Sequence, residues 1–378
     1  MPLLVVVPPG PVDLRDGLFR TTAKFADGMA MYAELWPGEV AVVGTPADVA
    51  DDSNLGAVAL DLDALPYDVV TTSDVAGTLR SRATDAAVLP LDERHADLIG
   101  AAHRTVLAAE HTGRSRLEML LASPVGPVDR LRAEVGFRRL TPRLQRLVSR
   151  ADGVQCNGQV AWEAYAPHSR APLRVYDSRL RLAEVQEARQ RRAGRTPDGT
   201  LRLAFSGRLL PIKGPEHAVE VHRRLRAAGH DVALDVYGDG PMLAGLRADA
   251  PDVTFHGSLD FASEWCPAVS GSTDLMLLPH VQSDPAGTYL ESAGMGVPVL
   301  GFDNVALRHL VDVAGLGWTV PLRRNDLLAR KVQELAERPE ELQRAGEAGI
   351  AFMEEHCFEH DFAARVEHLL DLVGSAVE

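Results

Sequence analysis

The stretch that decides the fold runs from residue 201 to residue 241 and reads LRLAFSGRLLPIKGPEHAVEVHRRLRAAGHDVALDVYGDGP. The apolar runs LRLAF and VALDVY predict two strands. The segment PEHAVEVHRRLRAAG between them predicts a helix that begins at a proline and ends at a glycine. Strands that alternate with helices form parallel sheets, so this stretch indicates a βαβ unit.

The same alternation extends in both directions along the chain. In the second half we expect further strands at 253–257, 274–280 and 298–302, with helices at 241–250 and 288–296. The first half is less regular. There we expect strands at 3–7, 40–44, 68–73 and 105–112, with helices at 95–104 and 128–151. Strands that are nearly continuous in apolar residues are buried on both faces. We therefore predict an α/β chain made of two Rossmann-like, doubly wound domains that face each other across a cleft.

The length of the chain predicts two domains, because 378 residues exceed what one ordinary hydrophobic core holds. A change in composition along the chain sets their expected limits. A polar segment at 185–200 separates an N-terminal domain, 1–185, from a C-terminal domain, 200–360. The last helix, 361–378, could pack back on the N-terminal domain. The sequence leaves open whether the protein is a monomer or a homodimer.

Composition excludes several classes of protein. The net charge of −14 argues against a nucleic-acid partner. No apolar stretch approaches about 18 residues, which argues against membrane insertion. The three cysteines form no CxxC pair, and the N-terminus lacks a basic signal region, so we expect a cytoplasmic protein. We also find no basic amphipathic helix, which favours a soluble acceptor over a lipid one.

Ligands of open parallel sheets bind beyond the carboxyl ends of the strands. Gly207, Arg208 and Lys213 lie in such a turn, ahead of a helix whose N-terminus favours anions. A guanidinium and an ammonium there could clamp a diphosphate. A pair of ordinary surface cations is the alternative.

Three more strand ends carry suitable residues. Gly238 lies in YGDGP, where a simple tight turn is the alternative, and FHGSL contributes His256, Gly257 and Leu259, whose backbone could read a base edge. In the stretch 280–301, Thr288 and Glu291 have the spacing of a capping box. The N–H groups of Thr288 and Tyr289, beside Gly287 and Asp284, could instead form a second anion site.

These motifs resemble the nucleotide-binding half of the retaining GT-B glycosyltransferases of family four, also called glycosyl transferase group 1. The matching segments are FSGRLLPIKG, VYGDGP, FHGSL and GTYLESAGMGVPVLGFDN, about a third of the chain. The resemblance implies a nucleoside-diphosphate sugar donor, with UDP the expected nucleotide. It also implies that Arg208 and Lys213 hold the diphosphate, that Glu291 holds the ribose and that the FHGSL backbone holds the base.

One departure from the family pattern concerns the donor sugar. The family usually has a glutamate eight positions before the one matched by Glu291, and Ser283 stands there. Either Asp284 replaces it or the sugar is held differently.

In the first half, family members place a histidine near the strand end where Glu110, His111 and Thr112 stand. We expect His111 to orient the sugar and Glu110 to bind or activate the acceptor, and Gly17 and Arg20 are further candidates after the first strand.

The expected reaction is transfer of a hexosyl or N-acetylhexosaminyl group to a soluble small molecule, for example a specialised metabolite, with retention of configuration. The expected catalytic residues are His111, Glu110, Asp284, Arg208 and Lys213. We expect no cofactor and no metal, because no Asp-x-Asp motif stands in a suitable turn. The alternatives are a non-hydrolysing nucleotide-sugar epimerase and a catalytically weak regulator that binds sugar nucleotides.

Overall fold

The computed structural model describes residues 1–47, 57–121, 126–195, 199–283 and 285–374. The chain divides into two compact units. Unit 1 comprises Met1–Gly113, Gly136–Val175 and Glu359–Glu378, and unit 2 comprises Arg114–Val135 and Tyr176–Phe358.

Unit 1 is built on a parallel sheet of seven strands with the order β10-β9-β8-β7-β1-β4-β6. The strands are β1 (Leu3–Val6), β4 (Glu39–Gly44), β6 (Asp68–Thr71), β7 (Ala86–Pro90), β8 (Arg104–Ala109), β9 (Gly153–Asn157) and β10 (Pro172–Val175). A separate antiparallel sheet contains β2 (Asp13–Arg15), β3 (Leu18–Thr22) and β5 (Ala57–Asp61).

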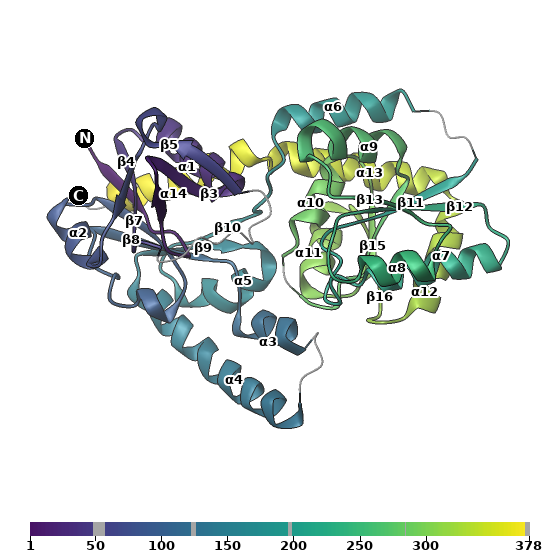
Figure 1. The fold of residues 1–378 in the computed structure, drawn as a ribbon, viewed down its shortest axis with the longest axis horizontal. Helices are drawn as coiled ribbons and strands as arrows, with labels where there is room; N and C mark the ends of the chain where they lie inside the picture. The colour runs from purple at the N-terminus through teal and green to yellow at the C-terminus, as the bar shows by residue number, and fades with distance from the viewer. Residues whose placement is uncertain (48–56, 122–125, 196–198, 284, 375–378) are drawn as a thin grey trace. The chain divides into compact units, whose positions relative to one another are not determined.

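Helices cover both faces of the unit 1 sheet, and alternate residues of β1, β4, β6, β7 and β8 enter opposite cores. Leu3 and Val5 pack with α2 (Val75–Ser81), α4 (Pro127–Arg150) and α5 (Gly158–Tyr165). Leu4 and Val6 pack with α1 (Ala23–Leu35) and α14 (Phe358–Gly374) (Figure 1). The C-terminal helix is tied further to this unit, because the Arg104 guanidinium donates to the carbonyl of Leu372 at 2.8 Å.

Unit 2 is built on a six-stranded parallel sheet with the order β13-β12-β11-β14-β15-β16. Its strands are β11 (Leu201–Ser206), β12 (Val232–Tyr237), β13 (Thr254–Gly257), β14 (Leu275–Leu278), β15 (Val299–Phe302) and β16 (Gly317–Val320). In chain order this is the 3-2-1-4-5-6 arrangement of a doubly wound fold, whose winding reverses between β11 and β14.

Helices again lie on both faces of the unit 2 sheet (Figure 1). The core on one face includes residues of α7 (Pro215–Ala227), α8 (Leu243–Asp249) and α12 (Asn325–Ala336). The unit also contains most of α3 (Gly113–Leu121), the first part of α4, and the helices α6 (Leu182–Ala193), α9 (Cys266–Ser272), α10 (Gly287–Gly294), α11 (Val305–Ala314) and α13 (Pro339–Glu355). The prediction of two doubly wound parallel sheets is confirmed.

One local prediction in unit 1 is wrong. Residues 95–104 form no continuous helix, because a single short turn, Glu93–His95, is followed by bends in which Gly100 has a φ of +85°. The segment after β1 contains a β-hairpin whose two turn residues, Asp16 and Gly17, have φ values of +55° and +74°. An Asp-Gly dipeptide is the preferred sequence for such a turn, so Gly17 has a structural explanation.

The expectation that the chain lacks a basic amphipathic helix is also wrong. Helix α4 contains seven arginines and two acidic residues. Its first half exposes Val128, Leu131 and Val135, while Leu144, Leu147 and Val148 of its second half are buried. Composition therefore gives no argument against a lipid acceptor. Among the residues described, no helix is both long and apolar enough to cross a membrane.

Candidate functional site

The loops after β11 and β14 meet at the point where the winding of unit 2 reverses. The amide of Val281 donates to the carbonyl of Ile212 at 3.1 Å. Gly214 lies so close to the second loop that a Cβ atom there would stand 2.3 Å from the carbonyl oxygen of Pro279. The two strand-end segments predicted to bind a ligand therefore touch each other.

Three of the predicted glycines bring the ends of β11, β12 and β13 together. The amide of Gly238 donates to the carbonyl of Gly257 at 2.7 Å, and the amide of Gly207 donates to that of Tyr237 at 3.0 Å. Gly207 and Gly238 have φ values of +140° and +127°, and a Cβ on Gly238 would lie 2.0 Å from the carbonyl oxygen of Gly207. Only glycine fits this contact.

The two predicted cations lie on the loop that leads into α7. Arg208 is exposed, and its guanidinium makes no hydrogen bond or ion pair with the described residues. Lys213 is half-buried and ends the loop just before Gly214 and Pro215, where α7 begins. A helix N-terminus and two cations on one loop form an environment that favours an anion.

His280 is a residue of this edge to which the sequence assigned no role. It is 1% exposed, and neither ring nitrogen has a hydrogen-bond partner among the described residues. Its ring lies 4.9 Å from that of Tyr289. Burial, with a smaller contribution from the charge of Lys213, holds the pKa of His280 well below its ordinary value, so the ring is neutral.

The start of α10 differs from the prediction in two respects. Thr288 caps nothing, because the helix begins at Gly287 and its N-cap, Ala286, makes no side-chain bond. The amide of Tyr289 is not free, since it donates to the carbonyl of Ala286 at 3.0 Å. The Tyr289 side chain is fully buried and accepts a hydrogen bond from Asn304. Tyr289 is therefore a core residue, and Gly287 and Thr288 are left as candidates for the anion site.

Glu291 projects from α10 into an ion pair with Arg179. The Arg179 Nε lies 2.9 Å from Glu291 Oε1, and the Glu291 side chain is 12% exposed. Arg179 also lies 3.7 Å above the ring of Phe261. The carboxylate is thus held in place by a neighbour from outside the predicted motifs.

Ser283, which stands where the family usually has a glutamate, lies beside a carboxylate from helix α3. Asp284 lies outside the described residues. Ser283 is buried, and its amide donates to Oε2 of Glu118 at 2.8 Å. Glu118 belongs to α3 (Gly113–Leu121) and also pairs with Arg114. A carboxylate thus stands beside the position where the family places one, and no sequence motif could have shown it.

The FHGSL segment presents fewer free groups than expected. The Gly257 carbonyl is already an acceptor for Gly238. The His256 Nε2 lies 2.6 Å from Asp235 Oδ1, and its ring stacks on Tyr237 at 4.6 Å. Leu259 is half-buried. His256 is therefore fixed by its neighbours.

Glu110 and His111 follow the carboxyl end of β8 in unit 1, as the sequence places them. Glu110 is exposed and His111 is half-buried. The His111 carbonyl accepts a hydrogen bond from the Tyr165 hydroxyl at 3.1 Å, which anchors the loop to α5. Their catalytic roles remain predictions.

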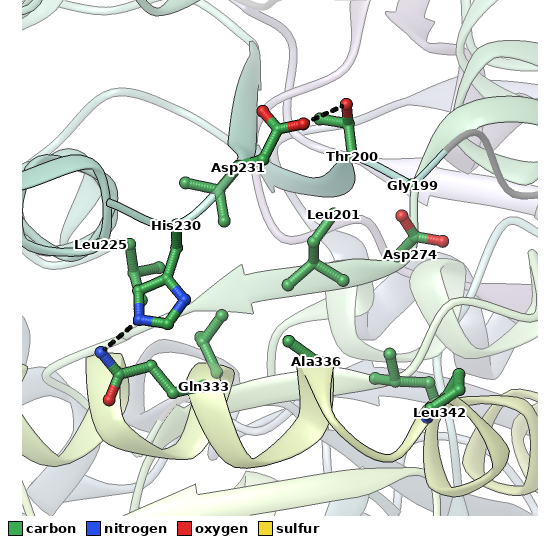
Figure 2. A pocket seen from close by; sticks show the side chains of 13 residues that line it. Gly199, Thr200, Leu201, Leu225, His230, Asp231, Asp274, Gln333, Ala336 and Leu342 are labelled. Atoms are coloured by element: carbon green, nitrogen blue, oxygen red, sulfur yellow. Dashed lines mark hydrogen bonds between the residues drawn. The ribbon is translucent and has the colours of Figure 1, made fainter. Parts of the chain in front are cut away.

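A cavity of about 300 Å³ lies at the opposite, amino edge of the unit 2 sheet (Figure 2). Its polar side chains already have partners. His230 bonds to Gln333 at 3.0 Å, and Thr200 donates to Asp231 at 2.9 Å. Asp274 pairs with Arg195 at 2.6 Å. These contacts tie together the segments that precede the strands and, through Gln333, helix α12, and they give the cavity a structural explanation.

No group of three or more His, Cys, Asp or Glu residues suited to a metal ion occurs within the described parts of the chain.

Comparison with known proteins gives the family of this site. The model for "Glycosyl transferases group 1" matches residues 200–338, which contain both contacting loops. This segment, less than half of the chain, is therefore similar to the glycosyl transferases group 1 family. The resemblance inferred from the four motifs is confirmed for this part of the chain.

Two relatives from Streptomyces kanamyceticus match over similar lengths. A 2-deoxystreptamine glucosyltransferase is 31% identical over 124 residues, 32% of this chain and 32% of the relative. An alpha-D-kanosaminyltransferase is 28% identical over 151 residues, 38% of this chain and 39% of the relative. The matches thus span about a third of the length of these curated relatives.

Solved structures share the fold over the whole chain. The structure of Anabaena HepE in complex with UDP has a TM-score of 0.66 at 14% identity and covers 98% of this chain and 100% of its own. The HepE complex with UDP-glucose has a TM-score of 0.64 at 14% identity, covering 98% and 99% of the two chains. The GT-B fold of glycosyltransferases is therefore confirmed.

Proposed function

We propose that this protein is a retaining glycosyltransferase that moves a sugar from a UDP-sugar to a small-molecule acceptor. The observation that carries the proposal is the carboxyl edge of unit 2. Loops 207–214 and 279–283 touch there within the segment that matches the glycosyltransferase family. UDP is favoured because HepE, which shares the fold, has been solved with UDP and UDP-glucose.

The residues of this edge would stabilise the departing nucleotide. Arg208, Lys213 and the N-terminus of α10 supply positive charge and N–H groups without a metal. The Gly207–Gly238 contact keeps Cβ atoms away from the backbone at the ends of β11 and β12. Glu291, oriented by Arg179, would accept hydrogen bonds from the ribose. Glu118 or Asp284 would then meet the sugar hydroxyls.

The acceptor is proposed to be a polar small molecule, because the names of both Streptomyces relatives indicate aminoglycoside-type chemistry. His111 and Glu110 of unit 1 are proposed to orient the donor sugar and to bind the acceptor. The three cysteines are buried and form no disulfide, which fits a cytoplasmic enzyme.

The test is a transfer assay with UDP-glucose and UDP-N-acetylglucosamine against a panel of polyols, amino sugars and aminocyclitols, read by mass spectrometry and by NMR of the new anomeric centre. We expect one product with retained configuration. A donor epimer formed without acceptor would favour the epimerase. UDP-sugar binding without turnover over the whole panel would favour the regulator.

A further inference from the structure

A cavity of about 330 Å³ lies within unit 1, at the carboxyl edge of its sheet. Segments that follow four neighbouring strands line it: residues 7–11 after β1, 44–45 at the end of β4, 73–76 after β6 and 94–98 after β7. The winding of this sheet reverses between β1 and β7. The cavity therefore occupies the position where an open parallel sheet binds a ligand.

The cavity lining is rich in hydrogen-bond acceptors. Asp97 is exposed, and its carboxylate makes no hydrogen bond or ion pair with the described residues. Asp74 uses Oδ1 to cap α2, accepting from the amide of Gly77 at 2.8 Å, so its Oδ2 remains for another donor. Two carboxylates therefore contribute negative charge to one cavity.

No positive charge in the lining offsets both of them. Arg94 is the one lysine or arginine among the lining residues, and it is bound to Asp92 through contacts of 3.1 and 3.4 Å. His95 is neutral near pH 7, because burial lowers its pKa. A ligand that brings its own positive charge would suit this lining, whereas a phosphate or carboxylate would be repelled.

We propose that this cavity binds the acceptor and that Asp97 recognises a protonated amino group on it. The ligand class is an amine-bearing, polyhydroxylated ring small enough for the cavity, with Asp74 and the hydroxyls of Ser73 and Thr45 meeting its other donors. This inference rests on the proposed function and assigns the acceptor's chemistry to named residues.

The experiment measures binding of three probes to the full chain by calorimetry: 2-deoxystreptamine, its di-N-acetyl derivative and myo-inositol. We expect the diamine to bind at least about tenfold more tightly than either neutral probe, the size expected for one charge-assisted hydrogen bond. Asp97→Asn should remove that preference. Asp63→Asn, an exposed carboxylate of unit 1 outside the cavity lining, is the matched control and should retain it.

A UDP titration of the same samples separates this inference from the proposed function. UDP binding together with equal affinity for charged and neutral probes, or with no binding of any of the three, would overturn the amine site and leave the donor site standing. An Asp97-dependent preference for the diamine without UDP binding would support the cavity and contradict the glycosyltransferase. An Asp97→Asn variant that keeps the wild-type preference would also overturn the inference.

Discussion

The two edges of the unit 2 sheet carry similar kinds of polar residue, but these residues differ in whether they have partners within the protein. At the amino edge, His230 and Asp231 each contact a partner side chain (Figure 2), and Asp274 pairs with Arg195. At the carboxyl edge, Arg208 and His280 have no such partner among the described residues. Buried polar groups are normally satisfied, so the buried, unsatisfied ring of His280 at the carboxyl edge indicates a ligand.

The backbone shows the same contrast. At the carboxyl edge, Gly207 and Gly238 are in contact, and a Cβ on Gly238 would collide with a carbonyl. At the amino edge, Gly229 also has a positive φ, +84°, but no atom lies within 4 Å of the position its Cβ would take. The comparison shows that close approach of backbone, and not a positive φ alone, distinguishes Gly238 from Gly229.

The largest expected effect comes from Lys213→Ala. Removing a charge that stabilises the departing diphosphate should lower kcat by about 10²-fold or more while the protein stays folded. The matched control is Lys331→Ala, which removes a lysine that pairs with Glu334 at 3.5 Å on α12. Steady-state kinetics with circular dichroism checks this. Equal kcat values for the two variants would contradict the role of Lys213 in stabilising the departing diphosphate.

Next in size is Gly238→Ala. The new Cβ would meet the Gly207 carbonyl at 2.0 Å, in a conformation that alanine rarely adopts. We expect a loss of about 2–4 kcal/mol in the free energy of unfolding, from strain and overpacking. Gly229→Ala should lose only about 1 kcal/mol, from its positive φ. Urea denaturation measures both, and similar losses would contradict the account of the backbone.

The smallest effect concerns His280 and pH. Its folded pKa lies well below the unfolded value of 6.5, so the unfolded state binds the extra proton as the pH falls through 6.5. Acidification therefore favours unfolding. Between pH 7.0 and 5.5 the wild type should lose about 1 kcal/mol more stability than His280→Asn. Urea titrations at the two pH values test this, and parallel losses would mean that His280 takes up a proton in the fold.

Local patterns predicted β11 to β15, the helices α7, α8 and α10 and the glycine turns of unit 2, because continuous apolar runs and Pro–Gly boundaries are properties of neighbouring residues. They did not predict β16, α9 or the helices α11 to α13. They failed at 95–104, where apolar periodicity suggested a helix and the bends around Gly100 prevent one. The Asp16–Gly17 hairpin was recognisable from its dipeptide. The T-x-x-E spacing misled, because α10 begins at Gly287, ahead of Thr288.

The contacts that define the site chemistry could not be predicted from local sequence. Glu118 reaches the amide of a residue 165 positions away, and Arg179 reaches Glu291 across 112 positions. The burial of His280 depends on Tyr289 from the following helix. Such pairings follow from the packing of whole elements, for which a single sequence carries no pattern.

The central claim is that the carboxyl edge of unit 2 binds UDP, and hydrogen exchange with and without UDP tests it most directly. The account predicts slower amide exchange in residues 207–214 and 286–292, with no change in residues 228–232 and 330–342 at the amino edge. Protection confined to the amino edge, or no protection in either place at saturating UDP, would contradict it.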